Sequence, residues 1–367
     1  MGTLILVFCT AFFVVLYATP PLIKVAILKR LFDEPGERKI HTRVVPTIGG
    51  VIIFAATLFS FSLWYEIKDV SNTLYVRQYI TEFKLLVACL LVLFFVGIKD
   101  DIIGTAPVKK LVAHVIVGLI LVLIGNIRIT GLHGIFEVYE LPYWGSVFLS
   151  LFTYIVVVNA LNLIDGVDGL AGGVGLIASF AFAAWFYLAN DQIYASLALA
   201  LAGALLGFLV FNFSPAKIFM GDSGSLILGL IICVLAIKII EYPSERLQGI
   251  LLYISKPVFV IATLIYPLAD TLRVFTIRAS KGVSPFSADR NHIHHRLIDC
   301  GLNHKWTVII IYIFNIIVIT ASVLLWSINQ NITFFIVAAL SAIFVLIIYL
   351  ISKSKQQKVE ENMSEES

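Results

Sequence analysis

Long apolar stretches separated by short polar segments run along the whole chain. A helix that crosses a membrane needs about 20 mostly apolar residues, and about eleven stretches meet that rule. They lie near residues 3–27, 46–65, 83–98, 110–126, 144–163, 169–189, 192–211, 224–240, 250–272, 306–327 and 332–351. The charges of the first stretch follow its apolar part and no small-residue cleavage site is present, so we expect an uncleaved span. The pattern predicts an all-α, polytopic membrane protein with about eleven transmembrane helices.

The composition supports a bilayer as the solvent. Hydrophobic residues make up 60% of the 367 residues and charged residues 13%, whereas soluble domains carry about 25% charged residues. The four cysteines are scattered, so we expect reduced thiols and no disulfide framework. We expect one transmembrane domain over residues 1–352. The polar tail over residues 353–367 is predicted to be disordered.

The basic residues indicate how the chain is oriented. If the stretches alternate across the bilayer, 18 of the 26 Lys and Arg residues fall in one set of loops and in the tail. The opposite loops hold only Lys68, Arg77, Arg128 and Arg246. Short loops rich in Lys and Arg stay in the cytoplasm. The N-terminus is therefore predicted to lie outside and the C-terminus in the cytoplasm.

Two adjacent carboxylates mark the end of the third stretch. Asp100 and Asp101 lie in the segment GIKDDIIG. An acid at the centre of a membrane helix costs about 2.5–3.5 kcal/mol on insertion scales. The pair therefore needs a cation or a basic partner, unless both acids are solvated at a helix end, which is the plain alternative.

A second acidic motif joins two apolar stretches. The segment NALNLIDGVDGLAGG, residues 159–173, places Asn159, Asn162, Asp165 and Asp168 within ten residues. Oxygen-rich side chains of this kind suit a hard cation such as Mg²⁺. A tight polar turn would not need two amides and two acids, so we favour a cation site.

A third motif lies at the start of the eighth stretch. Asp222 is followed by small residues in FMGDSGSLILG, residues 219–229. Free backbone N–H groups at a helix start can bind an anion, and an acid there can hold a metal that the anion also touches. Ordinary capping by Asp222 or Ser223 is the alternative and excludes neither.

The longest predicted cytoplasmic loop is rich in histidine and arginine. The segment SPFSADRNHIHHRL, residues 284–297, contains Arg290, His292, His294, His295 and Arg296. Zinc binding is one interpretation, but no cysteine accompanies the histidines and their spacing is not the usual i, i+4. Arg and His donate to oxyanions, so phosphate binding fits better.

A weaker basic segment precedes the second apolar stretch. In ERKIHTRVVPTIGG, residues 37–50, Lys39, His41 and Arg43 lie before Pro46. We favour cytoplasmic positive charge as the explanation for Arg43, whereas Lys39 and His41 are kept as candidates for substrate binding.

Together these motifs supply the parts of a phosphoryl-transfer site at the cytoplasmic membrane boundary. No P-loop is present, so an ATPase-type site is not indicated. The ordered motifs DD, NLIDGVDGLAGG, GDSGS and HIHH resemble the polyprenyl-phosphate N-acetylhexosamine-1-phosphate transferase family. The resemblance covers nearly the whole chain, and HIHH resembles the N-acetylglucosamine branch more than the phospho-MurNAc-pentapeptide branch.

The resemblance implies a reaction and a set of residue roles. Undecaprenyl phosphate would attack the β-phosphorus of UDP-N-acetylglucosamine, releasing UMP and forming undecaprenyl-diphospho-N-acetylglucosamine, the first membrane step of a cell-envelope polysaccharide. Asn162 and Asp222 would hold Mg²⁺, or Mn²⁺, against the pyrophosphate, and Asp100 would lie at the lipid phosphate. The candidate catalytic residues are Asp100, Asp101 and Asp165. The candidate substrate-binding residues are Lys39, His41, Lys110, Asn159, Asp168, Arg290, His292, His294 and His295.

Several alternatives stay open. Lys109 and Lys110 both suit the basic position after the acid pair, and we favour direct attack over an aspartyl intermediate because the phosphate nucleophile is already ionised. A peptidoglycan-precursor transferase would use the same chemistry. A transporter of cations or lipid-linked sugars would need polar groups at mid-depth and on an outward path, but the outer loops are nearly featureless.

The expected partners follow from the same resemblance. They are a UDP-N-acetylhexosamine, undecaprenyl phosphate and membrane lipid, with no nucleic acid, and a homodimer is left open. We expect a multi-pass protein of the bacterial cytoplasmic (inner) membrane whose active site faces the cytoplasm.

Overall fold

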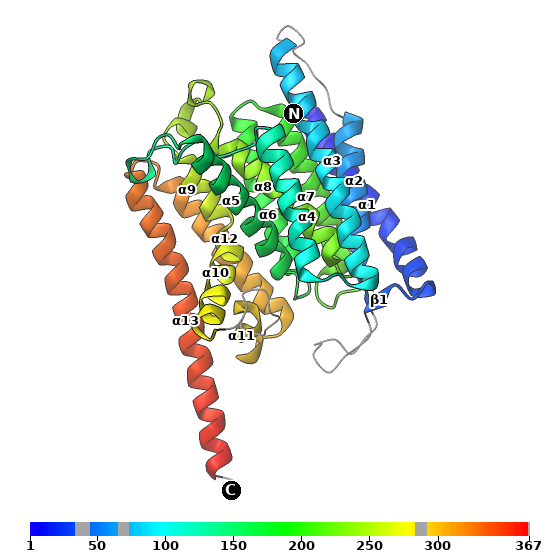
Figure 1. The fold of residues 1–367 in the computed structure, drawn as a ribbon. Helices are drawn as coiled ribbons and strands as arrows, with labels where there is room; N and C mark the ends of the chain where they lie inside the picture. The colour runs from blue at the N-terminus through cyan, green and yellow to red at the C-terminus, as the bar shows by residue number, and fades with distance from the viewer. Residues whose placement is uncertain (34–44, 65–72, 283–291, 366–367) are drawn as a thin grey trace.

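Long helices that run up and down beside one another form the protein (Figure 1). The computed structural model describes residues 1–33, 45–64, 73–282 and 292–365. The α-helices are α1 (Gly2–Leu28), α2 (Gly49–Trp64), α3 (Thr73–Ile103), α4 (Pro107–Leu119), α5 (Tyr143–Leu163), α6 (Leu170–Leu188), α7 (Gln192–Asn212), α8 (Gly221–Ile240), α9 (Lys256–Thr263), α10 (Ile265–Ser280), α11 (Ile293–Asp299), α12 (His304–Leu324) and α13 (Gln330–Glu365).

Short elements join these helices. The strands β1 (Phe32–Asp33) and β2 (Val45–Pro46) form an antiparallel pair. The π-helix η1 (Ile120–Ile124) extends α4. The 3-10 helices η2 (Ile135–Glu137), η3 (Ser244–Arg246) and η4 (Gly249–Leu252) lie in the connections after η1 and after α8.

Each predicted apolar stretch coincides with a helix or with a bent pair of helices. In the described part of the chain, nine helices are long and apolar enough to cross a membrane. The pair α9 and α10, bent by 72°, would make a tenth, and α2 is a shorter apolar helix. The prediction of an all-α polytopic membrane protein is confirmed, while the orientation of its termini stays a prediction.

The C-terminal helix is longer than its apolar stretch requires. α13 continues to Glu365 and so passes through most of the tail for which we expected disorder. Lys, Gln and Glu favour helix, and extending an existing helix avoids the cost of a new nucleus. The helix thus extends away from the bundle as far as Glu365 (Figure 1), while the predicted disorder of residues 353–367 stays a prediction.

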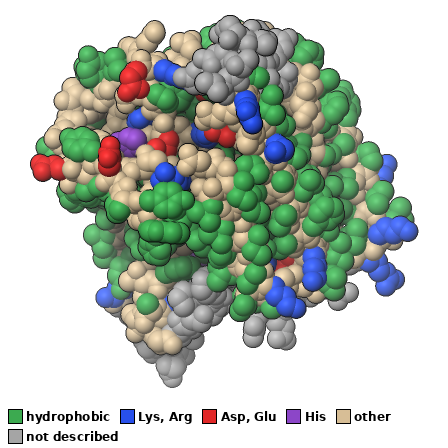
Figure 2. Space-filling model, turned by 45° about the horizontal axis from the view of Figure 1, so that its top comes forward, with side chains coloured by type: hydrophobic (Ala, Val, Ile, Leu, Met, Phe, Trp, Pro, Cys, Tyr) green, Lys and Arg blue, Asp and Glu red, His purple; other side chains and the backbone are tan. Residues whose placement is uncertain are grey.

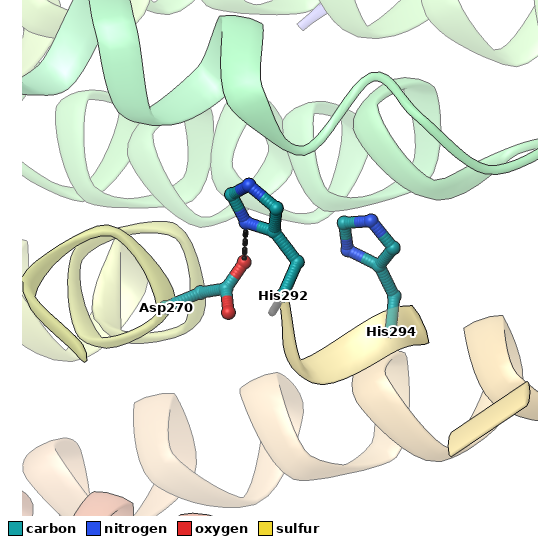
Figure 3. A group of neighbouring side chains, drawn as sticks. All are labelled: Asp270, His292 and His294. Carbon is teal, nitrogen blue, oxygen red and sulfur yellow. Dashed lines mark hydrogen bonds and ion pairs between the residues drawn. The ribbon is translucent and has the colours of Figure 1, made fainter. Parts of the chain in front are cut away.

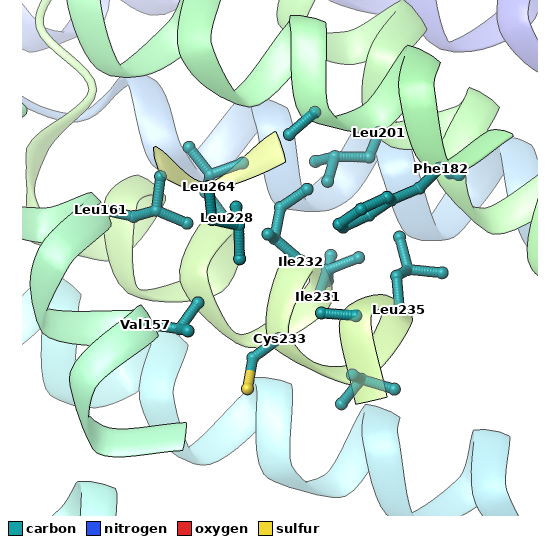
Figure 4. Packing of buried hydrophobic residues seen from close by; sticks show 14 of the residues in the cluster. Val157, Leu161, Phe182, Leu201, Leu228, Ile231, Ile232, Cys233, Leu235 and Leu264 are labelled. Atoms are coloured by element: carbon teal, nitrogen blue, oxygen red, sulfur yellow. The ribbon is translucent and has the colours of Figure 1, made fainter. Parts of the chain in front are cut away.

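Helix α8 lies at the centre of the apolar core. Nearly every residue of α8 is buried, and it packs against α2, α3, α5 and α6. Figure 4 shows Ile231, Ile232 and Cys233 of α8 among side chains of the surrounding helices, including Leu161 of α5 and Phe182 of α6. A helix that is apolar on all sides is expected to be buried in this way.

Glycines let two neighbours approach the start of α8 closely. A Cβ atom added at Gly50 of α2 would lie 2.0 Å from the backbone nitrogen of Gly224. One added at Gly97 of α3 would lie 2.5 Å from the Cα atom of Ser223. Small residues at such crossings allow helix backbones to touch in a membrane, so α2 and α3 fix the position of the first turn of α8.

We expect Gly50→Ala to destabilise the protein, because the added methyl group would meet backbone rather than a movable side chain. Overpacking of this kind costs about 1–3 kcal/mol. Thermal unfolding of the detergent-purified protein measures the effect. Gly2→Ala is the matched control, since nothing lies within 4 Å of a Cβ atom at that position. Equal melting temperatures for the two variants would contradict the close contact.

Candidate active site

Two carboxylates from other segments, one in α3 and one in the loop after α5, accept hydrogen bonds from backbone N–H groups at the start of α8. Asp101 of α3 accepts from the nitrogen of Asp222 at 2.7 Å through Oδ1 and from that of Ser223 at 3.1 Å through Oδ2. The backbone of Gly221 donates to Asp165, which follows α5. A helix N-terminus stabilises nearby negative charge. The anion that we expected at this helix start is therefore a side chain of the protein, and Asp101 takes the capping role that we considered for Asp222 or Ser223.

Gly221 is required at this junction. Its φ is +70°, and an added Cβ atom would lie 2.2 Å from the carbonyl oxygen of Thr47 and 2.7 Å from Oδ1 of Asp101. Only glycine adopts such a conformation freely and leaves room for both neighbours. The glycine of the GDSGS motif thus allows Asp101 to reach the first turn of α8.

The carboxylate of Asp222 joins residues from three other helices. Its Oδ2 is paired with the ammonium of Lys110 on α4, and Lys110 also lies 3.0 Å from Oδ2 of Asp100 on α3. Its Oδ1 accepts from Nδ2 of Asn162 on α5 at 3.0 Å, and the same amide group donates to Oγ of Ser225 at 2.8 Å. Four residues chosen from the sequence, Asp100, Lys110, Asn162 and Asp222, thus meet at one end of the bundle.

Among the described residues of this cluster, the acidic side chains outnumber the basic ones. Asp100, Asp101, Asp165 and Asp222 lie together, and Lys110 is the cation that pairs with two of them. Burial, reinforced by the negative charges of Asp222 and Asp101, raises the pKa of Asp165 well above its usual range. Several carboxylates around one ammonium group favour a second, divalent cation.

The donor atoms suit a hard cation. Asn162 uses its amide nitrogen for both of its hydrogen bonds, which leaves its amide oxygen as a ligand. Carboxylate and amide oxygens are the ligands that Mg²⁺ prefers. The cluster therefore fits the cation expected from the sequence, with Asn162 and Asp222 as the residues that would hold it.

A buried aspartate orients the histidine motif (Figure 3). Asp270 of α10 is fully buried, and its Oδ2 lies 2.8 Å from Nδ1 of His292. Its Oδ1 accepts from the backbone nitrogen of Ile293 at 2.8 Å, which caps α11. Because a carboxylate partner favours a proton on Nδ1, Nε2 of His292 is left to face away from Asp270, as Figure 3 shows.

The second histidine connects this motif to the acidic loop. His294 is buried, and its Nδ1 lies 3.3 Å from the hydroxyl of Tyr266. Burial, with His295, His292 and His304 nearby, holds the pKa of His294 well below its usual range, so the ring is neutral near pH 7. A Cβ atom added at Gly166 would lie 3.4 Å from its Nε2. The histidine motif therefore lies against the loop that carries Asp165.

The same group could hold a metal ion. Ligand atoms of Asp270, His292 and His294 all lie within 4.8 Å of one another. Asp270 was not among the candidates chosen from the sequence, and it lies far from the HIHH motif and in an apolar stretch. The two oxygens of Asp270 contact His292 and the backbone nitrogen of Ile293; phosphate binding by the histidines stays our prediction, with a metal ion as the alternative.

Polar residues outside the motifs hold the acidic loop in place. Asn212, at the end of α7, accepts from the nitrogen of Gly169 at 3.0 Å and donates to the carbonyl of Ile218 at 2.9 Å. The hydroxyl of Tyr312 donates to the carbonyl of Gly169. Sequence reasoning missed Asn212 and Tyr312, and the only signal was a polar group near the end of an apolar stretch.

The remaining candidates lie in different surroundings. Asp168 is buried, and its Oδ2 accepts from the nitrogen of Ala216 at 3.1 Å and lies 3.9 Å from Nδ1 of His304. Asn159 donates to the carbonyl of Ile155 in its own helix, so no bond of its side chain reaches the cluster in the described part of the chain. His295 is half-buried beside His294, with ring centroids 4.4 Å apart.

The last four candidates from the sequence lie outside the cluster or outside the described residues. Lys109 is exposed, so of the two lysines left open, Lys110 is the one within the cluster. Lys39, His41 and Arg290 lie outside the described residues. Their proposed roles stay predictions.

Comparisons with known proteins assign the chain to a family. Residues 83–240 match Glycosyl transferase family 4. The chain is 31% identical over 352 residues to the "Probable undecaprenyl-phosphate N-acetylglucosaminyl 1-phosphate transferase" of Bacillus subtilis, covering 95% of this chain and 91% of the relative. It is 31% identical over 325 residues to the decaprenyl-phosphate N-acetylglucosaminephosphotransferase of Mycobacterium tuberculosis, covering 85% and 80%.

A third relative has the same kind of name. The undecaprenyl-phosphate alpha-N-acetylglucosaminyl 1-phosphate transferase of Escherichia coli O157:H7 is 30% identical over 295 residues, which covers 78% of this chain and 74% of the relative. Similarity over most of both chains, together with the meeting of the motif residues at one end of the bundle, identifies the protein as a member of glycosyl transferase family 4, in the group of polyprenyl-phosphate N-acetylglucosamine 1-phosphate transferases.

Proposed function

We propose that this protein transfers N-acetylglucosamine 1-phosphate from UDP-N-acetylglucosamine to undecaprenyl phosphate. The proposal depends on one observation: four helices bring Asp100, Lys110, Asn162 and Asp222 together at one end of the bundle. The names of the relatives support the polyprenyl-phosphate acceptor and the N-acetylglucosamine donor, and nothing in them favours the peptidoglycan-precursor transferase.

The chemistry requires two anionic reactants to meet. An oxygen of the lipid phosphate forms a bond to the β-phosphorus of the nucleotide sugar, and the bond from that phosphorus to the bridging oxygen breaks. UMP leaves with the electron pair. Mg²⁺, held by Asn162 and Asp222, would neutralise the pyrophosphate when bound. Lys110 sits between Asp100 and Asp222, so it can turn to an incoming phosphate without leaving the cluster.

The bonds of Asp101 favour direct attack. Both of its oxygens accept from backbone N–H groups of α8, so a covalent bond to phosphorus would remove a cap of that helix. Asp101 therefore acts by positioning Asp222, and Asp100 is the acid left near the lipid phosphate. Because the lipid phosphate is already ionised, it needs little help from a base.

We place the site at the cytoplasmic surface of the bacterial inner membrane. A UDP-sugar is a cytosolic, water-soluble molecule, and the loops on the side of the acidic cluster carry most of the basic residues. With this orientation the N-terminus lies outside and the C-terminus in the cytoplasm.

The direct test is a donor panel. We expect purified protein with undecaprenyl phosphate and Mg²⁺ to release UMP and form a lipid-extractable sugar with UDP-N-acetylglucosamine. UDP-MurNAc-pentapeptide is the competing donor, and turnover with it alone would replace the proposed function by the peptidoglycan reaction. Omitting Mg²⁺ in the presence of EDTA should abolish turnover.

We expect Asp222→Asn to lower turnover by at least about 100-fold, because the amide removes the charge that pairs with Lys110 and holds the cation. UMP release across a Mg²⁺ titration measures the loss. Asp299→Asn is the control, since Asp299 is an exposed acid of α11 on the same side of the bundle. Turnover near that of the unchanged protein would remove Asp222 from the proposed cation site.

Asp270→Asn tests whether the buried acid orients His292. The amide oxygen can still accept from Ile293, but its NH₂ group opposes the proton on Nδ1 of His292. We expect KM for the UDP-sugar to rise about tenfold with a smaller change in kcat, by analogy with partners that orient ligand histidines, and the unfolding temperature to stay nearly constant. Zinc is measured in the same samples by elemental analysis. One zinc per unchanged chain, lost in the variant, would support the metal alternative instead.

A further inference from the structure

A charged cavity of about 680 Å³ lies at the end of the bundle opposite the candidate active site. Its walls come from the N-terminal part of α3, the segment after η1, the start of α7 and the end of α8. The acidic cluster involves the other ends of α3 and α8. Figure 2, which brings this face forward, shows basic and acidic side chains close together on it. Pockets for small ligands commonly measure about 300–1,000 Å³, so the cavity has the size of a binding site.

Basic residues from distant segments meet at this cavity. Arg77, Arg128 and Arg246 line it together with Lys238. These three arginines are three of the four basic residues that the predicted outer loops contain. They are more than fifty residues apart in sequence, so their meeting is a product of the fold rather than of a basic segment.

The acidic side chains that line the cavity form hydrogen bonds and an ion pair with neighbouring residues of the wall. Glu82 accepts from Gln78 at 2.9 Å and from Tyr194, and it pairs with Lys238. Asp191 accepts from the hydroxyl of Tyr79 at 2.9 Å and from the backbone of Tyr194 at 3.1 Å. Buried charges and polar groups with such partners are satisfied, so these two carboxylates are held within the wall.

The third acid is held in the same way. Glu241 accepts from the backbone and hydroxyl of Thr130, at 2.8 and 2.5 Å, and lies 3.1 Å from Nε2 of His133. Thus each of the three carboxylates has donors other than an arginine, although four basic side chains line the same space.

Two of the arginines present their positive charge to the cavity. Arg128 donates to Asn126 at 2.9 Å and to Ser146 at 2.7 Å, both neutral, and its guanidinium lies 4.9 Å from the ring centroid of Tyr143. These contacts fix the group without neutralising it. The side chain of Arg77 is exposed at the cavity. Guanidinium groups are well suited to phosphate because they donate two parallel hydrogen bonds.

We propose that this cavity binds the phosphate group of an anionic molecule at the membrane surface opposite the active site. Two sources carry this chemistry at that surface, the headgroup of an anionic phospholipid and free phosphate. The inference does not depend on the proposed transferase activity, because none of the residues that form the cavity belongs to the acidic cluster or the histidine motif.

The test is native mass spectrometry of the full-length protein in detergent. The probes are phosphatidylglycerol, zwitterionic phosphatidylcholine and inorganic phosphate, each titrated separately. We expect phosphatidylglycerol or phosphate to bind with a stoichiometry of one. Each arginine replaced by glutamine should weaken binding about 5-fold, the effect of one basic residue near an anionic surface. The variants are Arg77→Gln and the double variant Arg77→Gln, Arg128→Gln.

Controls separate the cavity from general attraction to charge. Lys29→Gln removes an exposed basic residue at the other end of the bundle and should bind like the unchanged protein. Arg77→Gln keeps the test valid if the double variant is unstable, since the Arg77 side chain is exposed. If phosphatidylglycerol binds and inorganic phosphate displaces it, the result supports recognition of the phosphate group. If only inorganic phosphate binds, the site is assigned to the free anion. Equal retention of phosphatidylcholine, or equal loss in Lys29→Gln, would overturn the proposal.

Discussion

The site depends on which groups accept hydrogen bonds from the backbone N–H groups in the first turn of α8. Three successive N–H groups at a helix start need partners, and here Asp165 and Asp101 supply them from two other segments. Each unmet N–H group would cost about 1–3 kcal/mol when buried. The main role of these two acids is therefore to cap the N-terminus of α8. By fixing the first turn of that helix, they also fix the direction of the Asp222 side chain. The glycines at 50, 97 and 221 are the geometric condition for this arrangement, because they let α2, α3 and Asp101 reach that turn.

This arrangement also sets the electrostatics. The dipole of α8 favours the charged form of the two capping acids. Burial and the neighbouring acids oppose it and raise the pKa of Asp165, and Asp100 and Asp222 both lie beside Lys110. Lys110 stabilises this group of acids by lying between Asp100 and Asp222. A divalent cation bound among the acids would stabilise the group further. The same surplus of negative charge would repel a pyrophosphate. In the proposed function, a divalent cation held at this cluster would offset the repulsion between the acids and the pyrophosphate.

The sequence predicts the spans well because a bilayer imposes both length and composition, and each apolar stretch carries that signal alone. It also predicts Asp100, Asn162 and Asp222, since polar and charged groups are rare in apolar stretches and gather at one predicted face. Lys110 was added by the family resemblance. Partners were harder to predict. Asp270 and Tyr312 lie in apolar stretches where a single polar residue has several explanations, and only the packing of α10 and α12 brings them to the histidines and to Gly169. The role of Asp101 was missed for a related reason, because a cap supplied across helices leaves no local pattern.

The cavity opposite the candidate active site shows that the number of charges in a set of loops does not reveal where those charges meet in the fold. The small number of basic residues in the predicted outer loops suggested a nearly featureless surface, yet three arginines meet at the cavity. A polar space at each end could suggest a path for transport. Between the two ends, however, α8 runs from Leu226 to Ile237 without a charged or strongly polar side chain, and this stretch is buried on all sides (Figure 4). Moving an anion through it would cost far more than the few kcal/mol of an acid at a helix centre. Along α8 the two spaces are thus separated by an apolar, buried stretch, and the carboxylates that the proposed chemistry needs meet at one end of it.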